Sequence, residues 1–303
     1  MSQEFNRREV LGLSTALAGG MALASTGTGL AAQSGSGQKP SGRKYQLGTV
    51  TYNIAAHWDV PTLLKVCKDV GLTAVEFRTT HKHGVEPALA KPQRAEIRKR
   101  CADAGLRQLS LGTVCQFHEA DPAVVARNVE TCKQFIDLAS DLGAKGVKVR
   151  PNGLPKGVAV EKTLEQIGKA LRTCGQAAAD AGVEVWVEVH GSGTSHPPHM
   201  RTIMDVADHP AVGITWNSNG TDLKDGSIKE YFELLRPRLR CCHINELTSS
   251  YPWRELFGLL NAAGYDRYTL IEIAGLECDK IGDATRFLRF YKALWNELSG
   301  PAE

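Results

Sequence analysis

Four short apolar segments in the second half of the chain each end at or near a polar side chain that can bind a metal ion. These side chains are Glu188, Asn217, His243 and Glu272, and they recur at intervals of about 26 to 30 residues. Carboxylate, amide and imidazole groups together suit a hard or borderline divalent cation. A buried carboxylate is costly unless it is paired or bound to a metal. The pattern therefore predicts a metal site, and a purely structural polar network is the alternative interpretation.

Strand-like segments alternate with helical ones eight times over about 255 residues. The strands are short, continuous and rich in β-branched residues, as expected when both faces of a sheet are buried. We expect strands over residues 46–52, 74–77, 108–111, 146–149, 183–190, 212–217, 239–243 and 268–272. An open doubly wound sheet would give the same alternation. The count of eight and the absence of a GxGxxG turn favour a (β/α)8 TIM barrel, whose functional side chains lie at the C-terminal ends of its strands.

The bulk properties fit a single barrel. The chain has 303 residues, 42% of them hydrophobic, and a formal net charge of +3. This charge balance argues against a nucleic-acid partner. The eight cysteines form no CxxC pattern, and the adjacent Cys241 and Cys242 point to opposite faces of one expected strand. We expect mostly reduced, structural thiols.

The N-terminal residues 1–32 resemble a twin-arginine signal peptide. Arg7 and Arg8 precede a short stretch rich in Ala and Gly, and small residues near Ala31 and Ala32 offer a cleavage site. The stretch is short and weak for a stable membrane span. Residues 33–43 read as a flexible linker and residues 44–303 as the barrel domain. We expect an exported, periplasmic protein; a disordered or cytoplasmic N-terminal segment is the alternative.

A second group of polar side chains follows the first strands or lies near the four residues named above. Cationic and hydrogen-bonding groups there would suit a polyol that bears a carboxylate or another anion. The alternatives are an ion-pair network between Glu76 and Arg78 or Lys148, a solvated loop around His81, and packing of His57 against the first helix. The candidate substrate-binding residues are His190, Arg78, Lys148, Arg150, His57, Glu76, His81 and Asn219.

These segments resemble the sugar phosphate isomerase/epimerase family, the xylose isomerase-like TIM barrels, over roughly residues 44–298. The segment Glu188-Val-His190-Gly is similar to the Glu-Asn-His motif of the family. The segment that begins at His243 is similar to its His-x-Lys-Asp segment, and the stretch from Gly264 to Glu272 is similar to its Gly-Tyr-(Asp/Asn)-Gly…Glu ending.

The resemblance implies one divalent metal (Mn, Mg, Co or Zn) held by Glu188, Asn217, His243 and Glu272. Asn217 stands where the family normally has Asp, so the site has one negative charge fewer and the metal occupancy is in question. Asn219 and Asp222 follow closely, and either could reach inward. The implied reaction is proton transfer next to a carbonyl through an enediolate, with Glu188 and Glu272 as the catalytic acid and base in either order.

We therefore expect a sugar isomerase or epimerase acting on a small sugar, keto-sugar or sugar acid, in a chain that could form a homo-oligomer. A 3-keto-sugar lyase or hydrolase would use the same acidity next to a carbonyl. A carbohydrate-binding barrel that has lost catalysis is the alternative that Asn217 favours. A DNA-repair role like that of endonuclease IV would need more metal ligands and a basic face.

Overall fold

The computed structural model describes residues 42–275 and 280–301. The expected signal peptide, residues 1–32, and most of the expected linker, residues 33–43, lie outside the described residues. Within the described ranges, no helix combines the length and the apolar character needed to cross a membrane.

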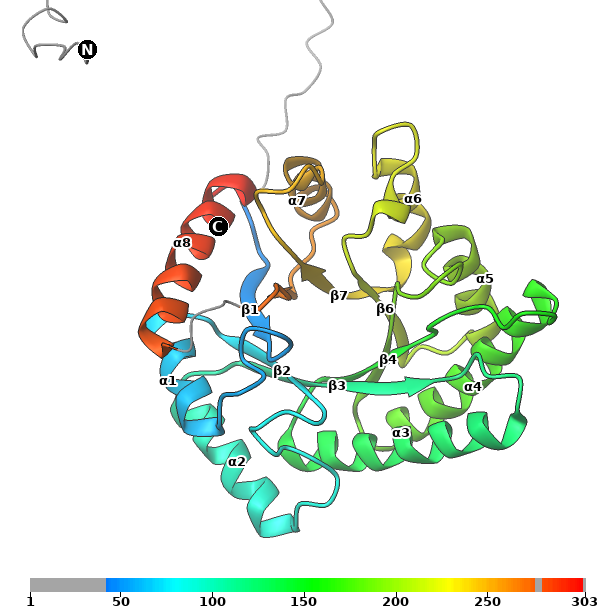
Figure 1. The fold of residues 1–303 in the computed structure, drawn as a ribbon, viewed down its shortest axis with the longest axis horizontal. Helices are drawn as coiled ribbons and strands as arrows, with labels where there is room; N and C mark the ends of the chain where they lie inside the picture. Colours follow the sequence, from blue (N-terminus) through cyan, green and yellow to red (C-terminus); the bar gives the residue numbers. More distant parts are fainter. Residues whose placement is uncertain (1–41, 276–279, 302–303) are drawn as a thin grey trace, which may run out of the picture. The chain divides into compact units, whose positions relative to one another are not determined.

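Eight parallel strands close into a barrel in sequence order, and β1 pairs with both β2 and β8. Figure 1 shows the helices arranged around these strands. The predicted TIM barrel is confirmed. The strands are β1 (Gln46–Val50), β2 (Ala74–Arg78), β3 (Gln108–Gln116), β4 (Gly146–Arg150), β5 (Glu184–Glu188), β6 (Val212–Trp216), β7 (Leu239–Ile244) and β8 (Tyr268–Ile271). The helices are α1 (Val60–Val70), α2 (Lys91–Asp103), α3 (Pro122–Leu142), α4 (Val160–Asp180), α5 (Pro197–Ala207), α6 (Lys229–Leu235), α7 (Trp253–Ala262) and α8 (Ile281–Ser299).

The first helix illustrates how the chain sets its helix ends. The carboxylate of Asp59 accepts a hydrogen bond from the backbone N–H of Thr62 at 3.0 Å, which caps α1 at its N-terminus. Gly71 follows α1 with a φ of 75°, and its N–H donates to the carbonyl of Cys67. This left-handed turn sends the chain back toward β2 at little steric cost because glycine lacks a Cβ.

The ends of three strands that matter for the site differ from the prediction. β3 is longer than expected, because it continues past an irregularity to pair Gln116 with Arg150 of β4. β6 and β8 end one residue early, so Asn217 and Glu272 lie just beyond the last strand residue. Their side chains therefore lie at the C-terminal mouth of the barrel.

An apolar layer fills the interior of the barrel beneath its C-terminal mouth. Trp186 of β5 is fully buried in it, and a Cβ on Gly146 would come within 2.3 Å of the indole ring, so only glycine fits there. Cys241 packs in this inner layer, whereas Cys242 packs in the layer between strands and helices. The inner layer consists of Val50, Ala74, Trp186, Cys241, Tyr268 and Leu270.

Arg43, which we expected in the linker, is part of the barrel domain. Its backbone N–H donates to the carbonyl of Pro301 at 2.8 Å, and its guanidinium donates to Ser299 Oγ at 2.6 Å. The guanidinium carbon also lies 3.9 Å from the centre of the Trp295 ring. These contacts with the end of the chain, which sequence reasoning does not provide, fix the start of the domain.

Candidate functional site

The side chains of Glu188, His243 and Glu272 meet at the C-terminal mouth of the barrel. His243 Nδ1 lies 3.2 Å from Glu272 Oε2 and 3.6 Å from Glu188 Oε1. His243 and Glu188 are almost fully buried, and the Glu272 side chain is 16% exposed. The barrel brings together residues that are up to 84 positions apart in the chain, because β5, β7 and β8 all end at this face.

The amide of Asn217 faces the same two carboxylates. When its nitrogen is turned toward them, it donates to Glu188 Oε1 at 3.3 Å and to Glu272 Oε2 at 3.2 Å. When its oxygen is turned toward them, its nitrogen donates to Asn219 Oδ1 at 3.5 Å. In that orientation three oxygens and one ring nitrogen point at one another, and a proton on His243 Nδ1 or a bound cation would offset their repulsion.

This donor set fits a divalent cation. Ligand atoms of Glu188, His243 and Glu272 all lie within 4.8 Å of one another. His243 Nδ1 is buried and makes no well-formed hydrogen bond, although two carboxylate oxygens are close to it. Ligands about 2.0–2.2 Å from a common ion are separated by distances of this order. Such an ion would be held by His243 Nδ1, by the carboxylates of Glu188 and Glu272, and by the amide of Asn217.

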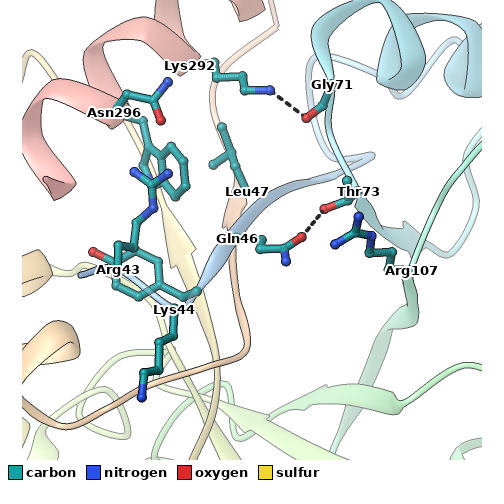
Figure 2. Close-up of a pocket in the computed structure, with 11 residues that line it drawn as sticks. Arg43, Lys44, Gln46, Leu47, Gly71, Thr73, Arg107, Lys292 and Asn296 are labelled. Carbon is teal, nitrogen blue, oxygen red and sulfur yellow. Dashed lines mark hydrogen bonds between the residues drawn. The ribbon is translucent and has the colours of Figure 1, made fainter. Parts of the chain in front are cut away.

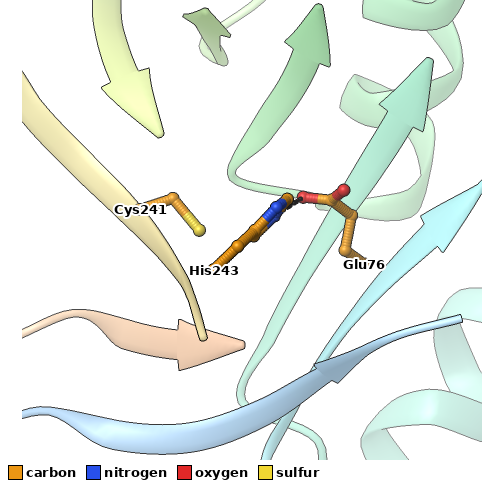
Figure 3. A group of neighbouring side chains, drawn as sticks. All are labelled: Glu76, Cys241 and His243. Carbon is orange, nitrogen blue, oxygen red and sulfur yellow. Dashed lines mark hydrogen bonds and ion pairs between the residues drawn. The ribbon is translucent and has the colours of Figure 1, made fainter. Parts of the chain in front are cut away.

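The other nitrogen of His243 fixes the orientation of the ring. His243 Nε2 donates to Glu76 Oε2 at 3.3 Å, and Figure 3 shows the ring reaching from β7 toward that carboxylate. Glu76, Cys241 and His243 form a second group of potential ligands. Burial raises the pKa of the Cys241 thiol, which packs in the apolar inner layer. Glu76 is therefore best understood as the carboxylate that orients a ligating histidine.

Lys148 and Glu188 form a buried ion pair beside this cluster. Lys148 Nζ donates to Glu188 Oε2 at 2.8 Å, so the two oxygens of Glu188 have different partners. Burial opposes the charge on Glu188, but Lys148 and His243 outweigh it and hold the pKa of that carboxyl well below its usual range. Burial likewise opposes a proton on His243, but Glu272 and Glu76 raise the pKa of His243 well above its usual range. The site therefore favours positive charge at the imidazole, carried by a proton or by a cation.

A cavity of about 140 Å³ opens above these groups. It is polar, and both signs of charge line it. Of the predicted substrate-binding residues, Arg78, Lys148, Arg150 and His190 lie in its wall. The full lining is Tyr52, Arg78, Thr113, Lys148, Arg150, Glu188, His190, Asn217 and Glu272.

Four other predicted residues do not line this cavity, and one of them is Glu76, which is bonded to His243 Nε2. His57 is exposed and lines a separate hollow with Trp58, so it is not at the site. His81 bonds to Thr51 Oγ1 at 3.1 Å, and burial lowers its pKa to about 4. Asn219 donates to the carbonyl of Val189 at 2.6 Å, which ties the end of β6 to that of β5.

Asp222 does not supply the carboxylate that Asn217 lacks. Its Oδ2 accepts hydrogen bonds from the Asn219 N–H at 2.7 Å and from the Tyr251 hydroxyl at 2.9 Å. Tyr251 in turn accepts from Trp216 Nε1 at 2.9 Å. Asp222 therefore points away from the cluster and fixes the loop after β6.

The structure adds two cavity residues that sequence reasoning missed. Thr113 lies on the part of β3 that extends beyond the predicted strand, and its hydroxyl donates to the carbonyl of Lys148 at 2.8 Å. Tyr52 follows β1, and its ring lies 5.3 Å from the guanidinium carbon of Arg78. A longer third strand was the only signal that could have identified Thr113.

A second hollow, of about 450 Å³, lies where the strands begin (Figure 2). Two of its cations bond to the protein itself: Lys292 Nζ donates to the carbonyl of Gly71 at 2.7 Å, and Arg43 donates to Ser299 at the end of α8. Gln46 accepts from Thr73 at 2.9 Å. Neither a carboxylate nor a histidine lines this hollow, so acid–base chemistry is better placed at the opposite mouth.

Comparisons with known proteins agree with the fold. The family described as xylose isomerase-like TIM barrel matches residues 64–291. A crystal structure of D-psicose 3-epimerase in the presence of D-fructose is 15% identical with a TM-score of 0.71, covering 84% of this chain and 100% of that one. L-Ribulose 3-epimerase is 18% identical with a TM-score of 0.70, covering 84% and 95%. The IOLI protein with a binding zinc atom is 14% identical with a TM-score of 0.64, covering 84% and 98%. No curated protein sequence matches the chain.

Proposed function

Because the chain belongs to the xylose isomerase-like TIM barrel family, we propose that it is a sugar isomerase- or epimerase-like enzyme that moves a proton next to a carbonyl. The observation that carries this proposal is the convergence of Glu188, His243 and Glu272, with an orphaned ring nitrogen, beneath a polar cavity. Structural neighbours named as ketose 3-epimerases support the same class of reaction.

The four residues Glu188, Asn217, His243 and Glu272 would hold one divalent cation, and a zinc-containing neighbour supports this. The chemistry supplied by such a cation is electrostatic stabilisation of the negative charge that develops on a carbonyl oxygen. Lys148 adds a fixed positive charge from the β4 side of the same cavity. Its ammonium would stabilise an enediolate in the same way.

Two carboxylates that line the same cavity allow a proton to leave and return. Glu188 comes from β5 and Glu272 from β8, three strands apart around the barrel. One, as the carboxylate, removes the carbon-bound proton and becomes a carboxylic acid, and the other, in its protonated form, returns a proton to the opposite face or to the neighbouring carbon. Glu272 is the more exposed of the two and has no lysine partner among the described residues. Glu272 is therefore the more accessible of the two to a substrate in the cavity.

The substrate we propose is a small free sugar, keto-sugar or sugar acid in the periplasm. The Arg7–Arg8 pattern, which resembles a twin-arginine signal, supports this location. Because sugar phosphates are mainly cytoplasmic, a periplasmic location favours free sugars and sugar acids. Replacing both arginines with lysine in a full-length fusion to a periplasm-dependent reporter tests the location. Loss of reporter activity is expected, and full activity would contradict twin-arginine export.

The reaction class is tested by hydrogen–deuterium exchange. The full-length protein is incubated in D2O with candidate ketoses, keto-sugars and sugar acids, and deuterium at carbon is measured by NMR. Exchange at the carbon next to the carbonyl supports the proposal, and elemental analysis of the same sample for Mn, Mg, Co and Zn identifies the cation. The absence of exchange with every candidate, in a protein that contains metal, would contradict it.

A carbohydrate-binding barrel without catalysis is the second candidate. Two observations favour it: Asn217 is neutral, and Lys148 already occupies one oxygen of Glu188. A protein that binds a sugar in calorimetry, contains no metal and exchanges no carbon-bound proton would support this function. A 3-keto-sugar lyase or hydrolase would instead show exchange together with cleavage of the substrate.

A further inference from the structure

The ends of β4 and β5 each contribute two polar side chains to the cavity. Lys148 and Arg150 alternate along β4, and Glu188 and His190 alternate at the end of β5. Alternate residues of a strand point to the same face, so all four line the cavity. Lys148 lies opposite Trp186 in the strand register, and its long side chain reaches Glu188 in a direct ion pair of 2.8 Å.

Arg150, unlike Lys148, has no carboxylate partner in the described part of the chain. Among the residues that the structure describes, no Asp or Glu oxygen lies within ion-pair distance of the Arg150 guanidinium. Arg150 Nε is buried and has no hydrogen-bond partner among these residues, and the same holds for His190 Nδ1 beside it. Both residues line the cavity, so a polar ligand that displaces water there would satisfy the two atoms.

We propose that Arg150 and His190 form a carboxylate subsite, so that the substrate is a small hydroxy or keto acid rather than a neutral sugar. A guanidinium binds a carboxylate through two parallel hydrogen bonds, which no other side chain reproduces. His190 Nδ1 supplies a hydrogen bond to a hydroxyl of the same molecule. This inference rests on the proposed function for the reaction, but the binding of the acid can be measured without turnover.

The position of the subsite orients the ligand. A carboxylate bound to Arg150 would place the carbons that follow it beside Glu188, Glu272 and Asn217, which line the same cavity. The cavity of 140 Å³ has the room of about five water molecules, which suits a short acid. Arg78 is already engaged with the Thr79 carbonyl at 2.7 Å and with Thr80 at 2.8 Å. Both bonds use Arg78 Nη1, whereas the Arg150 side chain makes no hydrogen bond or ion pair with any described residue.

Calorimetry with a matched pair of ligands tests this subsite. L-Threonate and L-threitol have the same four-carbon skeleton and differ in the carboxylate. With the full-length protein as purified and its metal content measured, threonate should bind about 10- to 100-fold more tightly than threitol. Arg150→Met should abolish this preference, and Arg150→Lys should retain part of it, because the charge remains without the planar fork.

The control is Arg127→Met, which removes an exposed arginine on α3 and should leave the preference unchanged. Circular dichroism and metal content confirm that each variant is folded and equally loaded. Equal binding of threonate and threitol, or a preference that survives in Arg150→Met, would overturn the subsite. Threonate binding through Arg150, in a protein that contains metal and exchanges no carbon-bound proton of any keto acid or ketose, would keep the subsite and refute the isomerase. Exchange with a neutral ketose, without binding of threonate, would support the isomerase and refute the subsite.

Discussion

Lys148 Nζ lies 2.8 Å from Glu188 Oε2, and both side chains are at least 95% buried. The other oxygen of the same carboxylate, Oε1, faces His243 and Asn217. Glu188 therefore links a permanent cation on β4 to the cluster that would hold a metal. Asn217 is neutral and Lys148 is positively charged. Both make the net charge of the cluster less negative than it would be with Asp at position 217 and no lysine.

Because Lys148 and Glu188 form a buried ion pair, we expect replacing Lys148 alone to destabilise the fold much more than replacing both residues. Lys148→Met leaves Glu188 as a buried charge that only His243 compensates, and it should lower the free energy of unfolding by about 3–5 kcal/mol. Lys148→Met combined with Glu188→Gln removes both charges and should recover most of that loss. Urea unfolding in the presence of EDTA measures both variants. A single variant as stable as the double one would show that the pair carries no such energy.

Glu188→Gln and Glu272→Gln should each lower the rate of carbon-bound proton exchange by about 100- to 10,000-fold, the usual contribution of a positioned acid or base. Exchange is followed by NMR in D2O, and thermal unfolding confirms that the fold is intact. Glu246→Gln, a loop carboxylate after β7 that does not line the cavity, is the matched control. Near-wild-type exchange in either test variant would contradict the two-carboxylate mechanism.

Asn217→Asp should tighten binding of the divalent metal. The new carboxylate would lie about 3 Å from the oxygens of Glu188 and Glu272, so a cation among them gains one full charge. We expect an increase in affinity of about 10- to 100-fold, measured by competition with a chelating dye. Asn219→Asp, which changes the neighbouring amide that bonds to Val189, is the control. Unchanged affinity in Asn217→Asp would show that Asn217 is not a ligand.

Asp222 predicts a pH dependence of stability. Burial raises the pKa of Asp222 to about 7, although Tyr251 and the Asn219 N–H oppose the shift. The folded protein therefore holds this proton more tightly than the unfolded chain, and stability should fall as pH rises from about 4 to 7. Asp222→Asn keeps an oxygen acceptor and should flatten this slope, with a gain at pH 8 of at most about 4 kcal/mol. Chemical denaturation at several pH values measures the slope; an unchanged slope in Asp222→Asn would refute the shift.

Much of the site could be predicted because strand ends leave a local pattern. Glu188 and His243 follow alternating or continuous apolar residues, and in a parallel barrel every such end faces the same mouth. Arg78, Lys148 and Arg150 were found by the same reasoning and line the cavity. His57 was misplaced because it lies on a loop, where spacing does not determine direction. Thr113 was missed because the irregularity that lengthens β3 depends on its pairing with β4.

The amino-acid sequence alone determined the alternation of eight strands and helices, the glycine helix ends and the residue types at the strand ends, since each depends on local periodicity and backbone preference. Only the tertiary structure decided which charges meet. It paired Lys148 with Glu188, turned Asp222 toward Tyr251 and left Arg150 without a carboxylate. Such pairings depend on strand register and on side-chain direction across the closed barrel, and residues distant in sequence set both.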